Sequence, residues 1–122
     1  ADSLLYAPTS EIVAPALLRQ ETFNAGWRLT RRGLLARGDF ESAIRDFDAL
    51  PIEFVDSPDW VGRALAVARR FDQPNFLDAI YLACAEDLDA DLWTCDRRFV
   101  TSFGADRPQR VFLCPVDVAG RP

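Results

Sequence analysis

Short strand-like runs alternate with helical segments along almost the whole chain, and this alternation narrows the folds open to it. Short apolar runs predict strands at residues 11–14, 52–55, 91–95 and 110–113. Apolar residues at helical spacing predict helices at residues 16–32, 40–50, 57–71, 76–87 and 96–103. Such alternation favours an α/β layered domain with a mainly parallel sheet. The length of 122 residues suits one domain, so residues 1–122 are expected to form a single one.

Several residues mark where these helices begin and end. Pro15 suits the first turn of the first helix, and Gly33 is expected to end it. Asp39 is expected to cap the second helix, which Pro51 stops. The helix at residues 76–87 is the most apolar and contains several Ala residues, so it is expected to pack closely against a neighbour.

The chain contains no histidine, and this absence excludes several kinds of catalysis. Ser-His-Asp and Cys-His nucleophilic catalysis both need imidazole. So do imidazole acid–base catalysis and every zinc site with a His ligand. Any catalysis by this chain must therefore use carboxylates, hydroxyls, thiols or arginine, most simply together with a hard metal ion.

The charge balance and the hydropathy pattern limit which binding partners and which cellular location the sequence suggests. The formal net charge is −5, with 14 basic residues, all of them Arg, against 19 acidic ones. This balance argues against a chain-wide basic surface for nucleic acid, although it allows a local groove lined by Arg. No apolar run is long enough to span a membrane and no signal peptide is visible, so a cytoplasmic protein is expected.

The three cysteines are Cys84, Cys95 and Cys114, an odd number without CxxC spacing. Cys84 lies in an apolar run, whereas Cys95 and Cys114 follow strand-like runs. We therefore expect reduced and buried thiols rather than a disulfide framework.

Asp96 occupies a position where α/β domains commonly bind ligands. It follows the predicted strand 91–95 and opens the next helix, and ligands bind beyond the carboxyl ends of strands in open α/β sheets. Thr94, two residues earlier, points to the same side of the strand as Asp96. Taken alone, Asp96 is more simply interpreted as a helix N-cap. Arg97 and Arg98 follow directly and suit phosphate binding, although solvated helix surface is the simpler interpretation.

Two further carboxylates lie among apolar residues on predicted helices. Asp78 is in the first turn of the helix at residues 76–87, where the helix dipole favours an acid. Its apolar neighbours require a compensating Arg, backbone amide or cation. Glu21 shares the apolar stripe of its helix, with Asn24 beside it, and a solvated edge position explains it equally well.

Three segments together resemble the PIN domain family. Residues 15–25 (PALLRQETFNA) are similar to the family's first acidic helix. Residues 76–85 (FLDAIYLACA) resemble its helix with the pattern DA-aromatic-x-AxA, and residues 94–99 (TCDRRF) resemble its TxDxxF signature. The order and spacing of the segments fit the family over about residues 11–118. Within the family, the chain looks most similar to the VapC-type toxins of bacterial toxin–antitoxin pairs.

This resemblance implies a three-layer α/β/α fold with a mainly parallel central sheet. The N-terminal part of that fold is truncated in this chain if the family's first strand lies upstream of Ala1. It also implies a metal-dependent ribonuclease in which carboxylate-bound Mg²⁺ or Mn²⁺ activates water to hydrolyse RNA phosphodiester bonds. By resemblance, Glu21, Asp78 and Asp96 are catalytic, metal-binding residues, and Thr94 is a supporting hydroxyl. The implied partners besides RNA are a cognate antitoxin protein and a second copy in a homodimer.

The family's first acid has one candidate in this chain. PIN domains carry an Asp in a D-(A/T/S)-S-like turn just after their first strand, and Ala1-Asp2-Ser3 has that order. However, Asp2 lies only 19 residues before Glu21, where the family has more intervening chain. Two interpretations stay open. Either Asp2 is a catalytic and metal-binding residue and intervening chain is missing, or the first strand lies upstream of Ala1, as the absence of Met allows.

Two other functions stay open. One is a PIN-like binding or assembly module with impaired catalysis, motivated by the uncertain first Asp and the acidic net charge. Its partner peptide is then expected to dock on a helical surface around Phe40, Phe47, Trp60 and Phe71. The other is an acid-only, Mg²⁺-dependent phosphatase or nuclease of the α/β class, which shares the carboxylates but not the motifs.

Overall fold

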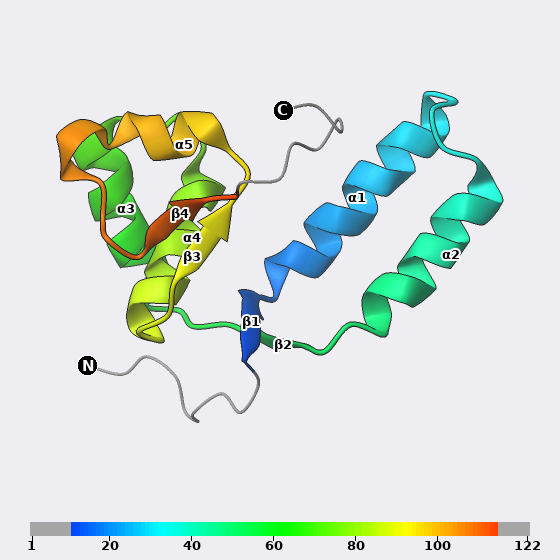
Figure 1. Ribbon diagram of the computed structural model, residues 1–122, viewed down its shortest axis with the longest axis horizontal. Helices are drawn as coiled ribbons and strands as arrows, with labels where there is room; N and C mark the ends of the chain where they lie inside the picture. The colour runs from blue at the N-terminus through cyan, green and yellow to red at the C-terminus, as the bar shows by residue number, and fades with distance from the viewer. Residues whose placement is uncertain (1–10, 115–122) are drawn as a thin grey trace. The chain divides into compact units, whose positions relative to one another are not determined.

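The computed structural model describes residues 11–114 and divides the chain into two compact units (Figure 1). The hairpin unit comprises the described residues 11–56, and the pocket unit comprises the described residues 57–114. Each unit contains helices and one pair of parallel strands, so the chain has a mixed α/β structure. The predicted α/β class with parallel strands is therefore confirmed at this level.

The hairpin unit consists of two helices between two paired strands. Its elements are β1 (Ile12–Pro15), α1 (Leu17–Arg31), α2 (Arg37–Asp48) and β2 (Ile52–Val55). The strands pair in parallel, with Ile12 opposite Ile52 and Pro15 opposite Val55. The backbone N–H of Ala16 donates to the carbonyl of Val55 at 2.8 Å, which extends the pairing to the start of α1.

Aromatic side chains connect the two helices of the hairpin unit. The rings of Phe23 and Phe47 meet edge to face with centroids 5.4 Å apart, and Trp27 lies 6.3 Å from Phe40. An ion pair of 2.9 Å joins Arg19 to Asp48 at the solvent surface. Neither helix contains a fully buried residue. The hairpin unit therefore buries little apolar surface by itself.

Gly26 marks the closest approach of α1 to α2. A Cβ atom at this position would lie 2.5 Å from Cε1 of Phe40. Alanine is the better helix former by about 1 kcal/mol, but overpacking of this kind costs about 1–3 kcal/mol. We therefore expect Gly26→Ala to lower the free energy of unfolding by about 1 kcal/mol in denaturant titrations.

A matched substitution separates the contact from helix propensity. A Cβ atom at Gly38, in α2 of the same unit, would meet no other atom within 4 Å. Gly38→Ala is therefore expected to raise the free energy of unfolding by about 0.5 kcal/mol. Equal stabilisation by both substitutions would show that Phe40 moves aside without cost. If the double variant Gly26→Ala/Phe40→Leu recovered stability, the contact with the Phe40 ring would be the cause of the lower free energy of unfolding of Gly26→Ala.

The pocket unit places two short parallel strands against four helical segments. Its elements are α3 (Trp60–Phe71), α4 (Phe76–Asp87), β3 (Leu92–Thr94), α5 (Arg97–Ser102), the 3₁₀ turn η1 (Gly104–Asp106) and β4 (Val111–Leu113). Leu92 lies opposite Val111, and Thr94 lies opposite Leu113. The core of the unit is a cluster of apolar side chains from α4, α5, its C-cap and β4, namely Leu82, Phe99, Val100, Phe103 and Val111.

Small residues bring α3 and α4 together. Ala64 on α3 and both Ala79 and Ala83 on α4 are completely buried. Six residues of α4 are buried, which matches the nearly all-round apolar character of its sequence: Ala79, Ile80, Leu82, Ala83, Cys84 and Ala85. The expectation that this helix packs closely against a neighbour is confirmed.

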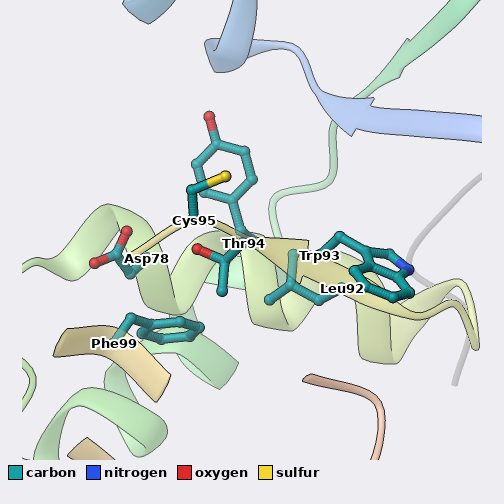
Figure 2. Close-up of a pocket in the computed structure, with 7 residues that line it drawn as sticks. Asp78, Leu92, Trp93, Thr94, Cys95 and Phe99 are labelled. Carbon is teal, nitrogen blue, oxygen red and sulfur yellow. The ribbon is translucent and has the colours of Figure 1, made fainter. Parts of the chain in front are cut away.

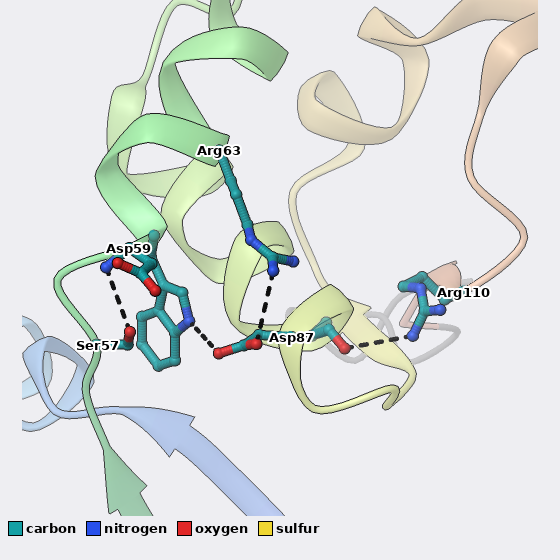
Figure 3. Close-up of polar contacts among 7 residues, drawn as sticks. Ser57, Asp59, Arg63, Asp87 and Arg110 are labelled. Carbon is teal, nitrogen blue, oxygen red and sulfur yellow. Dashed lines mark hydrogen bonds and ion pairs between the residues drawn. The ribbon is translucent and has the colours of Figure 1, made fainter. Parts of the chain in front are cut away.

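A buried carboxylate connects the start of α3 to the end of α4 (Figure 3). The Asp87 side chain is only 2% exposed, and one of its oxygens accepts a hydrogen bond of 2.9 Å from the indole Nε1–H of Trp60. Its other oxygen lies 3.7 Å from the Arg63 guanidinium. Trp60 is itself 1% exposed. Because an unpaired indole N–H or carboxylate is costly in a protein interior, these contacts stabilise the packing of α3 on α4.

Arg110 fastens the turn between α4 and β3. Its guanidinium donates to the carbonyl of Ala90 at 2.8 Å and to the Asp89 carboxylate at 3.2 Å. Arg110 directly precedes β4, and its own carbonyl accepts from the N–H of Leu92 at 2.8 Å. These bonds hold β3 beside β4 at their amino-terminal ends.

The predicted helices and strands are found within a few residues of their expected bounds. Several expectations about single residues are wrong. Asp39 does not cap α2, which begins at Arg37 after the extended residue Ala36, so Asp39 lies in the first helical turn. Trp60 is buried and hydrogen-bonded within the pocket unit, so it is not available for a docking surface. Cys95 is exposed and Cys114 is half-exposed, so of the three cysteines only Cys84 is buried as expected. Pro15 is the last residue of β1, and α1 begins two residues later, so Pro15 does not lie in the first helical turn.

Among residues 11–114, no helix has both the length and the apolar character needed to cross a membrane.

Candidate functional site

Asp96 caps the helix that follows β3. Its backbone is extended, and Oδ1 accepts hydrogen bonds from the N–H groups of Arg98 at 3.0 Å and Phe99 at 3.2 Å. The capping interpretation of Asp96 is therefore confirmed. Both bonds use Oδ1 and the residue is exposed, so capping does not exclude a second role for the carboxylate.

Thr94 positions the segment that carries Asp96. Its Oγ1 accepts a hydrogen bond of 3.1 Å from the backbone N–H of Asp96. Its carbonyl accepts a bond of 2.6 Å from the N–H of Cys114, just past the end of β4. The chain is thus held on both sides of the turn from β3 to α5, and the Asp96 backbone is fixed relative to the sheet.

Asp78 lies in the first turn of α4, where Asn75 caps the helix. The Asn75 side chain accepts a hydrogen bond of 2.9 Å from the N–H of Leu77. Asp78 is half-buried. It lines a pocket of about 220 Å³ whose other walls come from α4, β3 and the start of α5: Tyr81, Leu92, Trp93, Thr94, Cys95 and Phe99. In Figure 2 the Asp78 carboxylate and the Thr94 hydroxyl group lie toward one side of the view, and the Trp93 indole lies toward the other.

The structure thus brings the two most specific sequence motifs together in one unit. Asp78 and Thr94 share a pocket, and Asp96 is hydrogen-bonded to Thr94. Glu21 belongs to the hairpin unit, where it is half-buried on α1. Asp2 lies outside the described residues.

The donors in the pocket unit suit a hard cation by their chemistry. Asp78, Thr94 and Asp96 present oxygen atoms, which are the ligands that Mg²⁺ and Mn²⁺ prefer. Within residues 11–114, no three Asp, Glu or Cys side chains are arranged so that they could hold a metal ion. The oxygen donors of the pocket unit therefore fit the expected ion in kind, and a complete ligand set needs further carboxylates.

Tyr81 and Cys95 line the pocket, although the sequence interpretation assigned neither of them to the site. Tyr81 lies three residues after Asp78 on α4, and side chains at that spacing share one face of a helix. This spacing is the signal that identifies Tyr81. Cys95 was expected to be buried because it follows an apolar run.

The Cys95 thiol interacts with the Cys114 thiol. A hydrogen bond between the two side chains raises the pKa of Cys95 above its ordinary value, and partial desolvation raises it further.

Comparison of the chain with protein-family models finds no match, and comparison with curated proteins also finds none.

Proposed function

We propose that this chain is a PIN-like, metal-dependent endoribonuclease of the VapC toxin type. The observation that carries the proposal is the convergence of two motifs that are separate in the sequence. Asp78 of the first motif and Thr94 of the second line one pocket, and the Thr94 hydroxyl holds the backbone of Asp96. The absence of histidine is compatible with this chemistry, since hydrolysis at a carboxylate-bound metal needs no imidazole.

By the resemblance, the carboxylates that would hold Mg²⁺ or Mn²⁺ are Glu21, Asp78 and Asp96, with Asp2 as the further candidate. When bound, such an ion lowers the pKa of a water molecule and offsets the negative charge that develops at phosphorus. The chain itself supplies the placement. The cap of α5 restrains one oxygen of Asp96, so the carboxylate keeps one orientation. The exposed Arg97 and Arg98 directly after it suit contacts to RNA phosphates.

The test is cleavage of a structured RNA by purified protein with Mg²⁺ or Mn²⁺. We expect phosphodiester hydrolysis that a chelator abolishes and that added Mg²⁺ or Mn²⁺ restores. Isothermal titration of the metal into the protein provides an independent readout. A folded chain that binds neither ion and cleaves no RNA would contradict the proposal.

The proposal extends to the fold and the partners. We propose that the chain has the three-layer α/β/α fold implied by the resemblance, that it forms a homodimer and that it binds an antitoxin. The partly exposed helices of the hairpin unit support an apolar contact with a second copy. Three large apolar side chains of α1 and the turn after it are substantially exposed: Trp27 (47%), Leu29 (40%) and Leu34 (66%).

A charge at the most exposed of these positions is expected to disrupt the dimer. Leu34→Asp should convert a dimer into a monomer in light scattering, because burying an unpaired carboxylate at an interface is costly. Its helical circular dichroism should stay unchanged, since Leu34 contributes little to the hairpin unit's own packing. Leu65→Asp, an exposed position on α3, is the control and should stay dimeric. A wild-type chain that is monomeric at every concentration would contradict the dimer proposal.

A second candidate function is a binding or assembly module with impaired catalysis. The observation that favours it is that no three carboxylate or thiol side chains in residues 11–114 are arranged to hold a metal ion. Its expected docking surface changes, because Trp60 is buried and Phe40 and Phe47 belong to a different unit from Phe71. The cleavage assay separates the two functions, since the module would not hydrolyse RNA.

A further inference from the structure

We propose that Cys95 and Cys114 form a redox-active dithiol that a peroxide converts reversibly into an intramolecular disulfide. The proposal requires neither a bound metal nor RNA, and it stands apart from the proposed ribonuclease function. It assigns a modification site to two residues that lie 19 positions apart in the chain.

The strand pairing places the two cysteines opposite each other. Thr94 lies opposite Leu113 in the parallel pairing of β3 with β4, so the next residues along each strand are Cys95 and Cys114. The pairing continues to this point, because the N–H of Cys114 donates to the carbonyl of Thr94 at 2.6 Å. Neighbouring strands lie about 4.8 Å apart. That separation falls within the Cα–Cα range of about 4.4–6.8 Å that disulfides span.

The position and exposure of the two side chains favour their oxidation to a disulfide, although the raised pKa of Cys95 makes the reaction slower than at a thiol of ordinary pKa. The Cys95 thiol also interacts with the Cys114 thiol, which agrees with the placement of the two side chains side by side by the strand pairing. Cys95 is exposed and Cys114 is half-exposed, so a small oxidant or reductant reaches the pair. Cys84, by contrast, is 4% exposed in the interior of α4. Exposed disulfides of this kind are the ones that reductants reverse most readily.

The reaction has two steps. Hydrogen peroxide first oxidises the Cys95 thiol to a sulfenic acid and is itself reduced to water. The Cys114 sulfur then attacks the sulfenic sulfur, so that an S–S bond forms and the S–O bond breaks. The departing hydroxide takes the Cys114 proton and leaves as a second water molecule. The disulfide ties the residue before Asp96 to the end of β4, at the wall of the pocket that Asp78 lines.

The experiment treats the reduced full chain with hydrogen peroxide, blocks the remaining thiols and measures the intact mass under denaturing conditions. We expect the number of titratable thiols to fall from three to one, with the loss of two hydrogens from a monomeric chain. Peptide mapping should identify a Cys95–Cys114 link. Dithiothreitol should restore all three thiols.

Matched variants decide which thiols react. In the Cys84→Ala variant, peroxide is expected to join both remaining thiols in a disulfide, as it joins the same two thiols in the wild type. Cys114→Ser should stop at a Cys95 sulfenic acid, which dimedone traps, and Cys95→Ser should resist mild oxidation. The proposal is overturned if peroxide leaves the Cys114 thiol intact in the wild type. It is likewise overturned if only intermolecular disulfides form.

Discussion

Replacing Asp96 by Asn is expected to lower metal-dependent RNA cleavage by at least roughly 100-fold, while the chain stays folded. A lost carboxylate ligand removes several kcal/mol of charge stabilisation at the reacting phosphate, and about 2.7 kcal/mol corresponds to a factor of 100. The fold should be preserved because Asn caps helices about as well as Asp. The N–H groups of Arg98 and Phe99 therefore keep an acceptor in the variant. Initial rates of cleavage of a fluorescent RNA give the first measurement, and denaturant unfolding gives the second.

Two further variants separate the role of the charge from the role of the cap. Asp96→Ala should lose activity to the same extent and also lower the free energy of unfolding by about 1 kcal/mol, since it removes the cap. Asp106→Asn removes an exposed carboxylate that does not line the pocket, and it should leave cleavage unchanged. If Asp96→Asn kept full activity, Asp96 would act only as a helix cap, and the assigned metal site would be wrong.

Replacing Asp87 by Ala is expected to destabilise the chain by about 3 kcal/mol, at the low end of the range for breaking a buried pair by removing one partner. The substitution removes the acceptor of the Trp60 indole N–H, which lies in the interior and has no access to water. It also removes the carboxylate that pairs with Arg63. Arg63 is 36% exposed, so water compensates part of its loss, whereas the indole N–H stays unpaired. Denaturant titration followed by circular dichroism measures the change.

The control for Asp87 is an ion pair on the surface of the same unit. Asp106 pairs with Arg70 at 3.6 Å, and both side chains are 67% exposed. Asp106→Ala should therefore change stability by no more than about 0.5 kcal/mol. Asp87→Asn should fall between the two, because an amide oxygen still accepts the indole hydrogen bond. Equal effects of Asp87→Ala and Asp106→Ala would show that the buried contact does not stabilise the packing of α3 on α4.

Local sequence signals predicted the elements well where they were unambiguous. The strand at residues 52–55 and the helix at residues 76–87 have the expected bounds, since Pro51 and the Pro74-Asn75 break set their starts. The sequence predicted that α2 starts at residue 40, after its actual start at Arg37, because Gly38 is a poor helix former and Asp39 is a good cap. In the structure α2 begins before both residues, and Asp39 instead lies in the first turn, where the helix dipole favours an acid.

The sequence by itself determined the helices, the strands and the chemical types available to a site, because periodicity, chain breakers and residue counts are local properties. It placed Asp96 correctly at a helix start after a strand, and it identified the Ala-rich helix that packs closely. It did not determine which side chains meet across the fold.

Only the tertiary structure decided three contacts: Asp78 shares a pocket with Thr94, Trp60 is buried against Asp87, and the Cys95 side chain interacts with Cys114. Each contact joins residues distant in the chain. Each depends on the register of β3 with β4 or on the packing of helices, which no local pattern encodes.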